Sequence, residues 1–265
     1  MANQSSNGKG VKKGPSGRSY RNARGLTRQP KKMRGRKVSS QRWLTRQLND
    51  PFVAEAKSRG FRSRAALKLE QMDDRYHILQ PGMAIVDLGC APGGWLQVSS
   101  IRTKLGHSKA RLIGIDLLDT EGVVDADIFT GDMTDPEMLE KVRLATGGAA
   151  DGVLSDMAAD TTGHRGTDHL RTTALLEAAL NFSINMLNKN GFFLAKCFRG
   201  GAERSLLDVM QRNFKTVRHV KPAASRAESV ESYVLATGFH GIGRAEDIAA
   251  DIAAGRRDAD AALII

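Results

Sequence analysis

The hydrophobic positions between residues 84 and 237 follow two alternating patterns. Short continuous apolar runs are typical of strands buried on both faces, and between them apolar residues recur at helical spacing. This alternation predicts an α/β domain in which helices cover both faces of a mostly parallel sheet. Strands are expected at 84–88, 111–116, a short stretch ending near 129–132, 152–155, 192–198, 215–220 and 232–237.

Helical spacing and end signals predict the helices between these strands. Ser63 is a candidate N-cap for the first, and Asn190 with Gly191 is the expected end of the longest. Two shorter helices are expected between residues 39 and 57, separated at Asn49, Asp50 and Pro51. The others are expected at 64–76, 95–105, 135–145, 170–187 and 202–213.

The apolar pattern also divides the chain. Residues 1–38 have almost no large apolar side chains, so they are predicted to form a disordered arm. Residues 39–238 hold the predicted domain, and the Ala- and Asp-rich tail 239–265 is expected to add at most a short helix.

Charge separates the arm from the domain. The whole chain carries a net charge of +11. Of its 40 Lys and Arg residues, 14 lie in residues 1–49, which contain no Asp or Glu. Such an arm favours a polyanionic partner and salt-sensitive binding. The alternative is a solvated tail without a partner.

Membrane and secretory signals are missing from the pattern. No apolar run reaches the ~18 residues of a membrane helix, and the N-terminus has no apolar leader. Cys90 and Cys197 lie in separate core-like segments, so we expect no disulfide, no zinc site and a reducing cytoplasm.

A glycine-rich loop follows the first strand, in the sequence IVDLGCAPGGW at residues 85–95. Glycines allow close backbone approach to a ligand. The spacing differs from G-x-G-x-x-G, and Pro92 has no N–H to offer a pyrophosphate. We therefore expect this loop to bind a nucleoside-type ligand, with S-adenosylmethionine as the candidate.

Three carboxylates, Asp116, Asp132 and Asp156, end the strands that follow this loop. The carboxyl edge of an open parallel sheet is where ligands bind. Asp116 is placed to accept hydrogen bonds from ribose hydroxyls, and Asp132 from an adenine amino group. The alternative is that each carboxylate caps a helix.

Lys196 lies inside the apolar run FFLAKCF at residues 192–198. A buried lysine requires a partner, which Asp156 on the neighbouring strand can supply. The alternative is an edge strand with its lysine in solvent. Taken alone, Glu231 is expected to be a solvated carboxylate at a strand start and Lys68 a basic residue on an exposed helix face.

Four separated motifs together resemble the FtsJ/RrmJ (RlmE) family of ribosomal RNA 2′-O-ribose methyltransferases. They are RSRAALKL (62–69), DLGCAPGGW (87–95), SDMA (155–158) with Lys196, and SRAESVESYVLATG (225–238). The resemblance covers roughly residues 39–238. It departs from simple bacterial members in the basic arm, the C-terminal tail, Cys90 and Ala159, which leaves the exact RNA target open.

The resemblance implies a Rossmann-like methyltransferase fold with S-adenosylmethionine and no metal. It maps a catalytic tetrad onto Lys68, Asp156, Lys196 and Glu231. It also implies that the cofactor contacts Gly89, Gly93, Gly94, Trp95, Asp116 and Asp132, with Asp156 beside the methyl donor. The implied substrate is a uridine in the A loop of large-subunit ribosomal RNA, within the assembled subunit. Lys196 would then receive or stabilise the leaving 2′-hydroxyl proton. Lys68 would hold the ribose and the adjacent phosphate or stabilise the developing alkoxide, and Glu231 would orient Lys68 or the hydroxyl.

Three alternatives stay open from the sequence. The same site could methylate a transfer RNA or an mRNA cap, or the fold could serve a non-catalytic ribosome-assembly protein, although all four tetrad positions are filled. A nicotinamide oxidoreductase is disfavoured by the loop spacing and Pro92. No coiled coil or leftover apolar stripe is present, so we expect a monomer.

Overall fold

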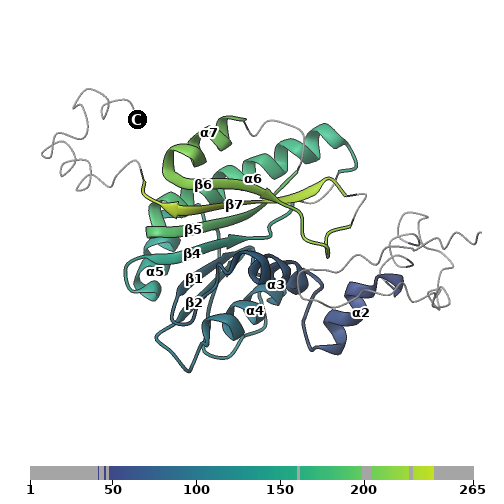
Figure 1. Cartoon of the computed structure of the whole chain (residues 1–265), viewed down its shortest axis with the longest axis horizontal. Helices are drawn as coiled ribbons and strands as arrows, with labels where there is room; N and C mark the ends of the chain where they lie inside the picture. Colours follow the sequence, from purple (N-terminus) through teal and green to yellow (C-terminus); the bar gives the residue numbers. More distant parts are fainter. Residues whose placement is uncertain are drawn as a thin grey trace, which may run out of the picture.

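A computed structural model describes Gln41, Thr45 and residues 48–159, 162–198, 204–226 and 229–241. The predicted arm at 1–38 and nearly all of the predicted tail lie outside these residues. The elements in chain order (Figure 1) are α2 (Pro51–Ser58), α3 (Ala65–Tyr76), β1 (Ala84–Leu88), α4 (Gly94–Thr103), β2 (Arg111–Asp116), β3 (Asp127–Thr130), α5 (Pro136–Thr146), β4 (Ala150–Ser155), α6 (Arg165–Met186), β5 (Leu187–Phe198), α7 (Arg204–Asn213), β6 (Phe214–Val220) and β7 (Glu231–Phe239).

Seven strands form one sheet in the order β3-β2-β1-β4-β5-β7-β6. The pairs from β3 to β5 are parallel, whereas β7 runs antiparallel to both β5 and β6. The chain therefore enters β1 in the middle of the sheet, winds outward to β3, and returns to build the other half. The predicted α/β architecture is confirmed.

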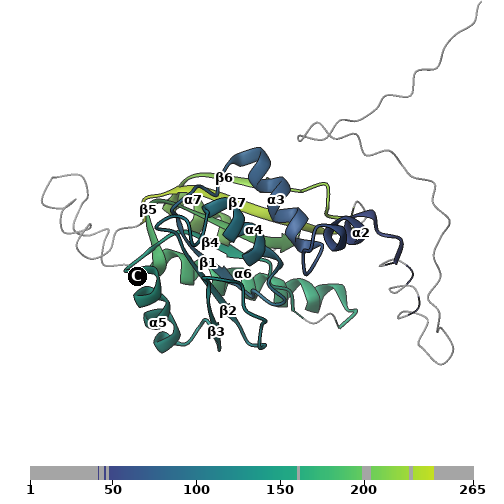
Figure 2. The ribbon, with the colours of Figure 1, turned by 90° about the horizontal axis from the view of Figure 1, so that it is seen from below.

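Two apolar layers sandwich the sheet. One contains the buried faces of α3 and α4, and the other those of α5, α6 and α7. Figure 2 shows α3 and α4 on one side of the sheet, with α5 and α6 on the other. The central strands β1 and β4 are buried on both faces, as their continuous apolar runs predict.

Several predicted strand limits are confirmed, and two helices have N-caps of the residue types that favour this position. The strands at 84–88 and 111–116 have the predicted limits. Asp50 caps α2 and Asp135 caps α5, and in both helices a proline follows the cap.

The start of α3 differs from prediction. Arg64 occupies the N-cap without a side-chain hydrogen bond, so Ser63 is not the cap. The Ser63 Oγ is instead buried against the glycine loop, where a Cβ on Gly94 would lie 2.5 Å from it. Contact with α4 therefore takes precedence over capping at this position.

The long helix α6 begins earlier than the predicted Leu170. Asp168 accepts hydrogen bonds from Thr162 and Gly163, and His164 accepts one from Thr167 N, which together organise the helix start. These local side-chain contacts shorten the connection after β4.

The end of α6 also differs from the prediction at Asn190 and Gly191. Leu187 is already extended and pairs with Ala150, so β5 begins there and contains both predicted turn residues. Asn188 donates a hydrogen bond to Asp151, which anchors this first part of the strand. Sheet pairing thus overrides the local turn signal.

Candidate active site

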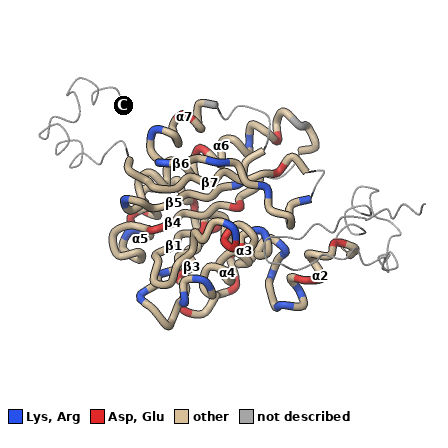
Figure 3. The backbone as a smooth tube through the Cα atoms, in the orientation of Figure 1, with Lys and Arg blue, Asp and Glu red and all other residues tan. Residues whose placement is uncertain are grey.

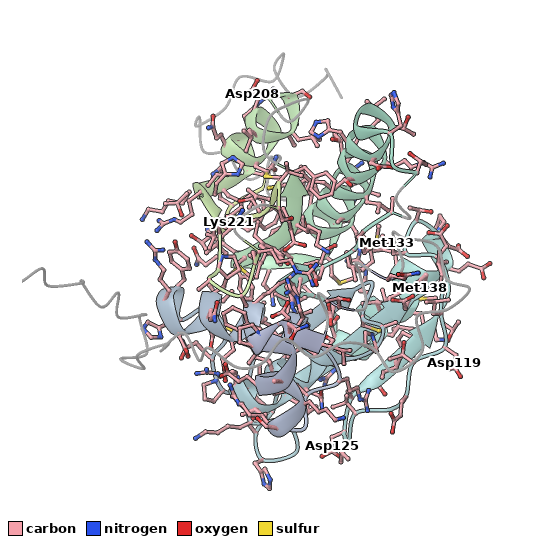
Figure 4. All side chains as sticks on the ribbon, turned by 90° about the vertical axis from the view of Figure 1, so that its right-hand side faces the viewer. Asp119, Asp125, Met133, Met138, Asp208 and Lys221 are labelled. Atoms are coloured by element: carbon pink, nitrogen blue, oxygen red, sulfur yellow. The ribbon has the colours of Figure 1, made fainter. Side chains whose placement is uncertain are left out.

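The predicted site residues gather at one edge of the sheet. The parallel strands β1, β2, β4 and β5 end there, and β7 begins there because Glu231 pairs with Phe198 in antiparallel register. Figure 4 looks at the molecule from this side. Asp119 and Asp125, in the loop after β2, lie in the lower half of the view, and Lys221, after β6, lies in the upper left. The edge lies next to α3 in Figure 1.

Lys196 is buried in β5, an interior strand between β4 and β7. Its Nζ forms an ion pair with Asp156 Oδ1 at 2.8 Å and donates a hydrogen bond to the Asp156 carbonyl at 2.7 Å. Asp156 directly follows Ser155, which pairs with Ala195, so the register itself brings the two side chains together. The predicted lysine–aspartate pair is confirmed, and the edge-strand alternative is wrong.

Lys68 lies on α3 but is only 5% exposed, so the expectation of an exposed helix face is wrong. Its Nζ donates to Glu231 Oε1 at 2.7 Å. Glu231 opens β7 as predicted, yet its carboxylate is held in this ion pair and not free in solvent. Helical spacing alone predicts that Lys68 is exposed. Lys68 is buried because it lies on the face of α3 that packs against the sheet.

Tyr233 joins these two pairs and was not among the predicted site residues. Its Oη accepts a hydrogen bond from Lys68 Nζ at 3.1 Å and donates one to Asp156 Oδ1 at 2.7 Å. Three hydrogen bonds and one ion pair therefore connect Glu231, Lys68, Tyr233, Asp156 and Lys196 into one polar network. The sequence signal for Tyr233 was its spacing from Glu231, because residues two apart on a strand have side chains on the same face. In the structure Tyr233 also pairs directly with Lys196.

Charge and burial shift two pKa values in this chain of side chains. Burial alone would raise the pKa of Glu231, but Lys68, Lys196 and a 2.9 Å hydrogen bond from Ser225 Oγ together bring the pKa below its ordinary value. Burial, Asp156 and Glu231 raise the pKa of Tyr233 well above its usual range. Tyr233 is therefore a neutral donor, and Glu231 a fixed negative charge.

The glycine loop has the predicted place between β1 and α4. Gly89 and Gly93 both have positive φ angles, of 72° and 99°, which glycine adopts without strain. A Cβ on Gly89 would collide with Met157, the residue after Asp156. This close approach holds the glycine loop against the strand end that carries the catalytic candidates.

Trp95 begins the first turn of α4 and is buried. Its indole Nε1 donates to the Ala65 carbonyl at 2.8 Å, and its ring lies 5.8 Å from that of Tyr233. Trp95 thus fixes α3 relative to β7. Its part in cofactor binding stays a prediction.

Asp116 and Asp132 stand at the expected ends of β2 and β3. Asp116 accepts hydrogen bonds from Ala91 N in the glycine loop and from Leu118 N, both within 2.9 Å. Asp132 is exposed and accepts from the backbone and hydroxyl of Thr134, which lower its pKa. The helix caps are Asp135 and His164, so the alternative that the three strand-end carboxylates cap helices is wrong.

Asp87 is a further buried acid of this edge that sequence reasoning did not single out. It is 1% exposed, and neither carboxylate oxygen has a hydrogen-bond partner among the described residues. Burial, followed by the charges of Asp156 and Asp116, raises its pKa well above the ordinary value. An acidic residue at the end of a buried strand was the available signal.

The remaining predicted features concern cysteines, metals and membranes. Cys90 and Cys197 are buried in the core and are not joined by a disulfide, and burial raises the pKa of Cys90 to about 12. Within the described ranges, no three His, Cys, Asp or Glu side chains are grouped to hold a metal ion. No helix in that part of the chain is long and apolar enough to cross a bilayer.

Comparisons with known proteins by sequence and by fold point to one family. The model of the FtsJ-like methyltransferase family matches residues 61–239. Two proteins named "Ribosomal RNA large subunit methyltransferase E" are similar: that of Mesorhizobium japonicum is 52% identical over 80% of each chain, and that of Paramagnetospirillum magneticum is 50% identical over 86% of this chain and 93% of its own. A crystal structure of a ribosomal RNA methyltransferase from Plasmodium falciparum matches with a TM-score of 0.61 and 28% identity, over 68% of this chain and all of that one.

Proposed function

The chain belongs to the FtsJ-like methyltransferase family, and we propose that it transfers a methyl group from S-adenosylmethionine to a ribose 2′-hydroxyl of large-subunit ribosomal RNA. The family uses this cofactor. The observation that carries the proposal is the polar network of hydrogen bonds and one ion pair from Glu231 to Lys196 beside the glycine loop. The acceptor that we propose, following the family resemblance, is a uridine of the A loop in the assembled subunit.

The charges at the edge fit S-adenosylmethionine, which carries a sulfonium and an ammonium group. Asp87, Asp116 and Asp156 lie close enough together that the charges of the latter two raise the pKa of the first. Asp87 has no hydrogen-bond partner among the described residues, so a cationic ligand would supply the compensation that the buried carboxylate lacks. The residues present therefore fit the cofactor.

Residues of the glycine loop and the next two strand ends would hold the cofactor. Gly89, Gly93 and Gly94 allow close backbone approach, while Asp116 and Asp132 have carboxylate oxygens for ribose and adenine donors. When bound, S-adenosylmethionine supplies a methyl group already activated by the positive sulfur. The protein's task is therefore to orient the ribose hydroxyl and remove its proton.

Lys196 is the residue that we assign to the proton of the 2′-hydroxyl. It can accept this proton only as a neutral amine. Once protonated, its Nζ has two oxygens of Asp156 within 2.8 Å to stabilise the ammonium. Asp156 thus positions the base and balances its charge.

Lys68 would hold the ribose or the adjacent phosphate and stabilise negative charge on the attacking oxygen. Its ammonium is fixed from two sides by Glu231 and Tyr233, which leaves one of its three N–H donors for the substrate. Glu231 is kept ionised by Lys68 and Lys196, so it positions Lys68 and does not itself accept the proton.

Methylation of purified large subunits with labelled S-adenosylmethionine tests the proposed function. We expect label in the large-subunit RNA, resistant to alkaline cleavage at one uridine of the A loop. Parallel reactions with free ribosomal RNA and with transfer RNA identify the acceptor. Label in transfer RNA alone would replace the proposed substrate, and no label in any RNA would overturn the function.

The working state of the protein is also part of this proposal. We propose a monomer that acts in the cytoplasm, where large subunits are found, with residues 39–238 as the catalytic domain and residues 1–38 as an RNA-binding arm. Sedimentation of the active enzyme alone and with subunits would reveal a dimer if this is wrong.

A further inference from the structure

The side chain of Arg62 connects two loops at the carboxyl edge of the sheet. Its Nη1 donates to the carbonyls of Pro92, at 3.2 Å, and Glu121, at 2.6 Å, and its Nη2 donates to the carbonyl of Gly122 at 2.7 Å. Pro92 belongs to the glycine loop after β1, whereas Glu121 and Gly122 belong to the loop after β2. One guanidinium therefore bridges two consecutive loops of the cofactor site.

We propose that Arg62 is a positioning residue that sets the spacing of these two loops and thereby the affinity for S-adenosylmethionine. The inference rests on the proposed function in one respect, the identity of the cofactor. It concerns the loops that carry the glycines and Asp116, and it assigns Arg62 no contact with the cofactor or RNA.

The surroundings of Arg62 show that this bridge is fixed by packing. A Cβ on Gly93 would collide with Arg62 Nη1, so the guanidinium occupies the space that this glycine leaves open. The backbone N of Arg62 donates to Gln97 Oε1 at 2.9 Å, and Gln97 Nε2 donates to the Gly60 carbonyl at 3.0 Å. Helix α4 thus holds the backbone of the segment while its side chain holds the loops.

Geometry, more than charge, explains the choice of arginine. The carboxylate of Glu121 is 3.9 Å from Nη2 and 86% exposed, so this ion pair is weak and screened. The three carbonyls need donors that point in several fixed directions from one planar group, which arginine offers and lysine does not. A lysine here would keep the positive charge but could not span both loops in the same way.

The bridge also links the cofactor loops to the catalytic helix. The segment from Arg62 to Ala65 leads directly into α3, which carries Lys68, and Trp95 holds Ala65 from the other side. Without the bridge, the two loops would sample a range of separations, and the fraction in the binding geometry would fall. Figure 3 shows the basic positions of this segment between α2 and α3.

The test compares Arg62→Gln and Arg62→Lys with Arg59→Gln in the full chain. Arg59 lies on the same segment, but its guanidinium binds Glu70 at 2.6 and 2.5 Å and neither cofactor loop, so it is the matched control. Binding of S-adenosylmethionine and of S-adenosylhomocysteine is measured by calorimetry, together with melting temperature without ligand and methylation kinetics on large subunits.

We expect Arg62→Gln to weaken both ligands by about ten-fold or more, since the variant removes three charge-assisted hydrogen bonds. Arg62→Lys should recover less than half of that loss in free energy. The KM for the cofactor should rise in proportion, while kcat at saturating cofactor stays within about two-fold of wild type. Arg59→Gln should bind both ligands as wild type does.

Three results would overturn the inference. They are wild-type ligand affinity in Arg62→Gln, full rescue by Arg62→Lys, or a loss of kcat or RNA affinity with cofactor affinity unchanged. If Arg62→Gln does not fold, the same criteria apply to Arg62→Lys. Failure of the wild-type enzyme to methylate ribosomal RNA would refute the proposed substrate, yet the binding measurements would still decide the role of Arg62.

Discussion

The hydroxyl of Tyr233 donates a hydrogen bond to Asp156 Oδ1 at 2.7 Å, and the same carboxylate oxygen receives Lys196 Nζ at 2.8 Å. Tyr233 also accepts from Lys68 at 3.1 Å, so this hydroxyl is the link between the two lysines of the site. Burial and the neighbouring acids raise the pKa of Tyr233 and keep it protonated. The direction of both hydrogen bonds is therefore fixed: Lys68 donates to Tyr233, and Tyr233 donates to Asp156. The Tyr233 hydroxyl therefore bridges Lys68 and Asp156, the acid that pairs with Lys196.

Replacement of Tyr233 by phenylalanine removes this link and leaves the ring. We expect kcat to fall about ten-fold to a hundred-fold, because Lys68 and Asp156 each lose a hydrogen bond to a charged group. Affinity for S-adenosylmethionine should stay unchanged, as measured by calorimetry. The control is Tyr76→Phe, since the Tyr76 ring stacks with Arg75 and Arg218 away from this network. Unchanged kcat in Tyr233→Phe would show that the two lysines act independently.

The strand limits and the functional residues at the strand ends were predictable because they depend on local sequence patterns. The limits of β1 and β2, the glycine loop, and the pairing of Lys196 with Asp156 all follow from apolar runs and strand order. Parallel strands end at one edge, so residues at strand ends meet without further information.

The predictions that were wrong concern residues whose environment depends on packing between segments distant in the sequence. Burial of Lys68 requires α3 to lie over β7, and no pattern within 64–76 encodes that arrangement. Ser63 has the chemistry of an N-cap but is used against Gly94, and the turn signal at Asn190 and Gly191 is overridden by pairing of β5 with β4. Family resemblance identified Lys68 and Glu231, whereas Tyr233 is recognisable only once α3 and β7 are packed together.

Removal of the Lys196 side chain tests the proposed base. We expect Lys196→Ala to lose methyl transfer by about a hundred-fold to ten-thousand-fold, the usual contribution of a positioned proton acceptor. Binding of S-adenosylmethionine should be nearly intact. Because alanine leaves a space beside Asp156, Lys196→Met serves as a second variant of similar length. Lys189, exposed near the start of the same strand, gives the control Lys189→Ala. Near-wild-type transfer by both Lys196 variants would eliminate it as the base.

Asp87 gives a pH-dependent prediction for stability without cofactor. Its raised pKa means that the folded chain retains this proton to higher pH than the unfolded chain does. Its contribution to stability is therefore complete below the unfolded value, about 3.9, and is lost as pH rises toward the folded pKa. Asparagine cannot ionise, so Asp87→Asn should gain stability relative to wild type as pH rises, by up to about 1.4 kcal/mol per unit within that window.

Denaturant unfolding of both proteins between pH 5 and pH 8 measures this difference. The control is Asp127→Asn, an exposed aspartate at the start of β3 for which no such slope is expected. A stability difference that stays constant over this range would mean that Asp87 is ionised in the folded chain. Cofactor binding should weaken in Asp87→Asn, because the neutral amide cannot balance a cationic ligand.

Deletion of the basic arm tests its proposed role in RNA binding. Residues 1–38 contain many of the 40 basic side chains and no acidic ones, so their removal should lower affinity for large-subunit RNA. For every phosphate that the arm no longer neutralises, the slope of log affinity against log salt should become shallower by about 0.7 to 0.9. Filter binding over a range of salt concentrations gives both quantities. Deletion of residues 242–265, which contain more acidic than basic side chains, provides the control and should leave the slope unchanged. An arm deletion with the wild-type slope would show that the arm does not bind the RNA, and the positive charge of the chain would then need another explanation.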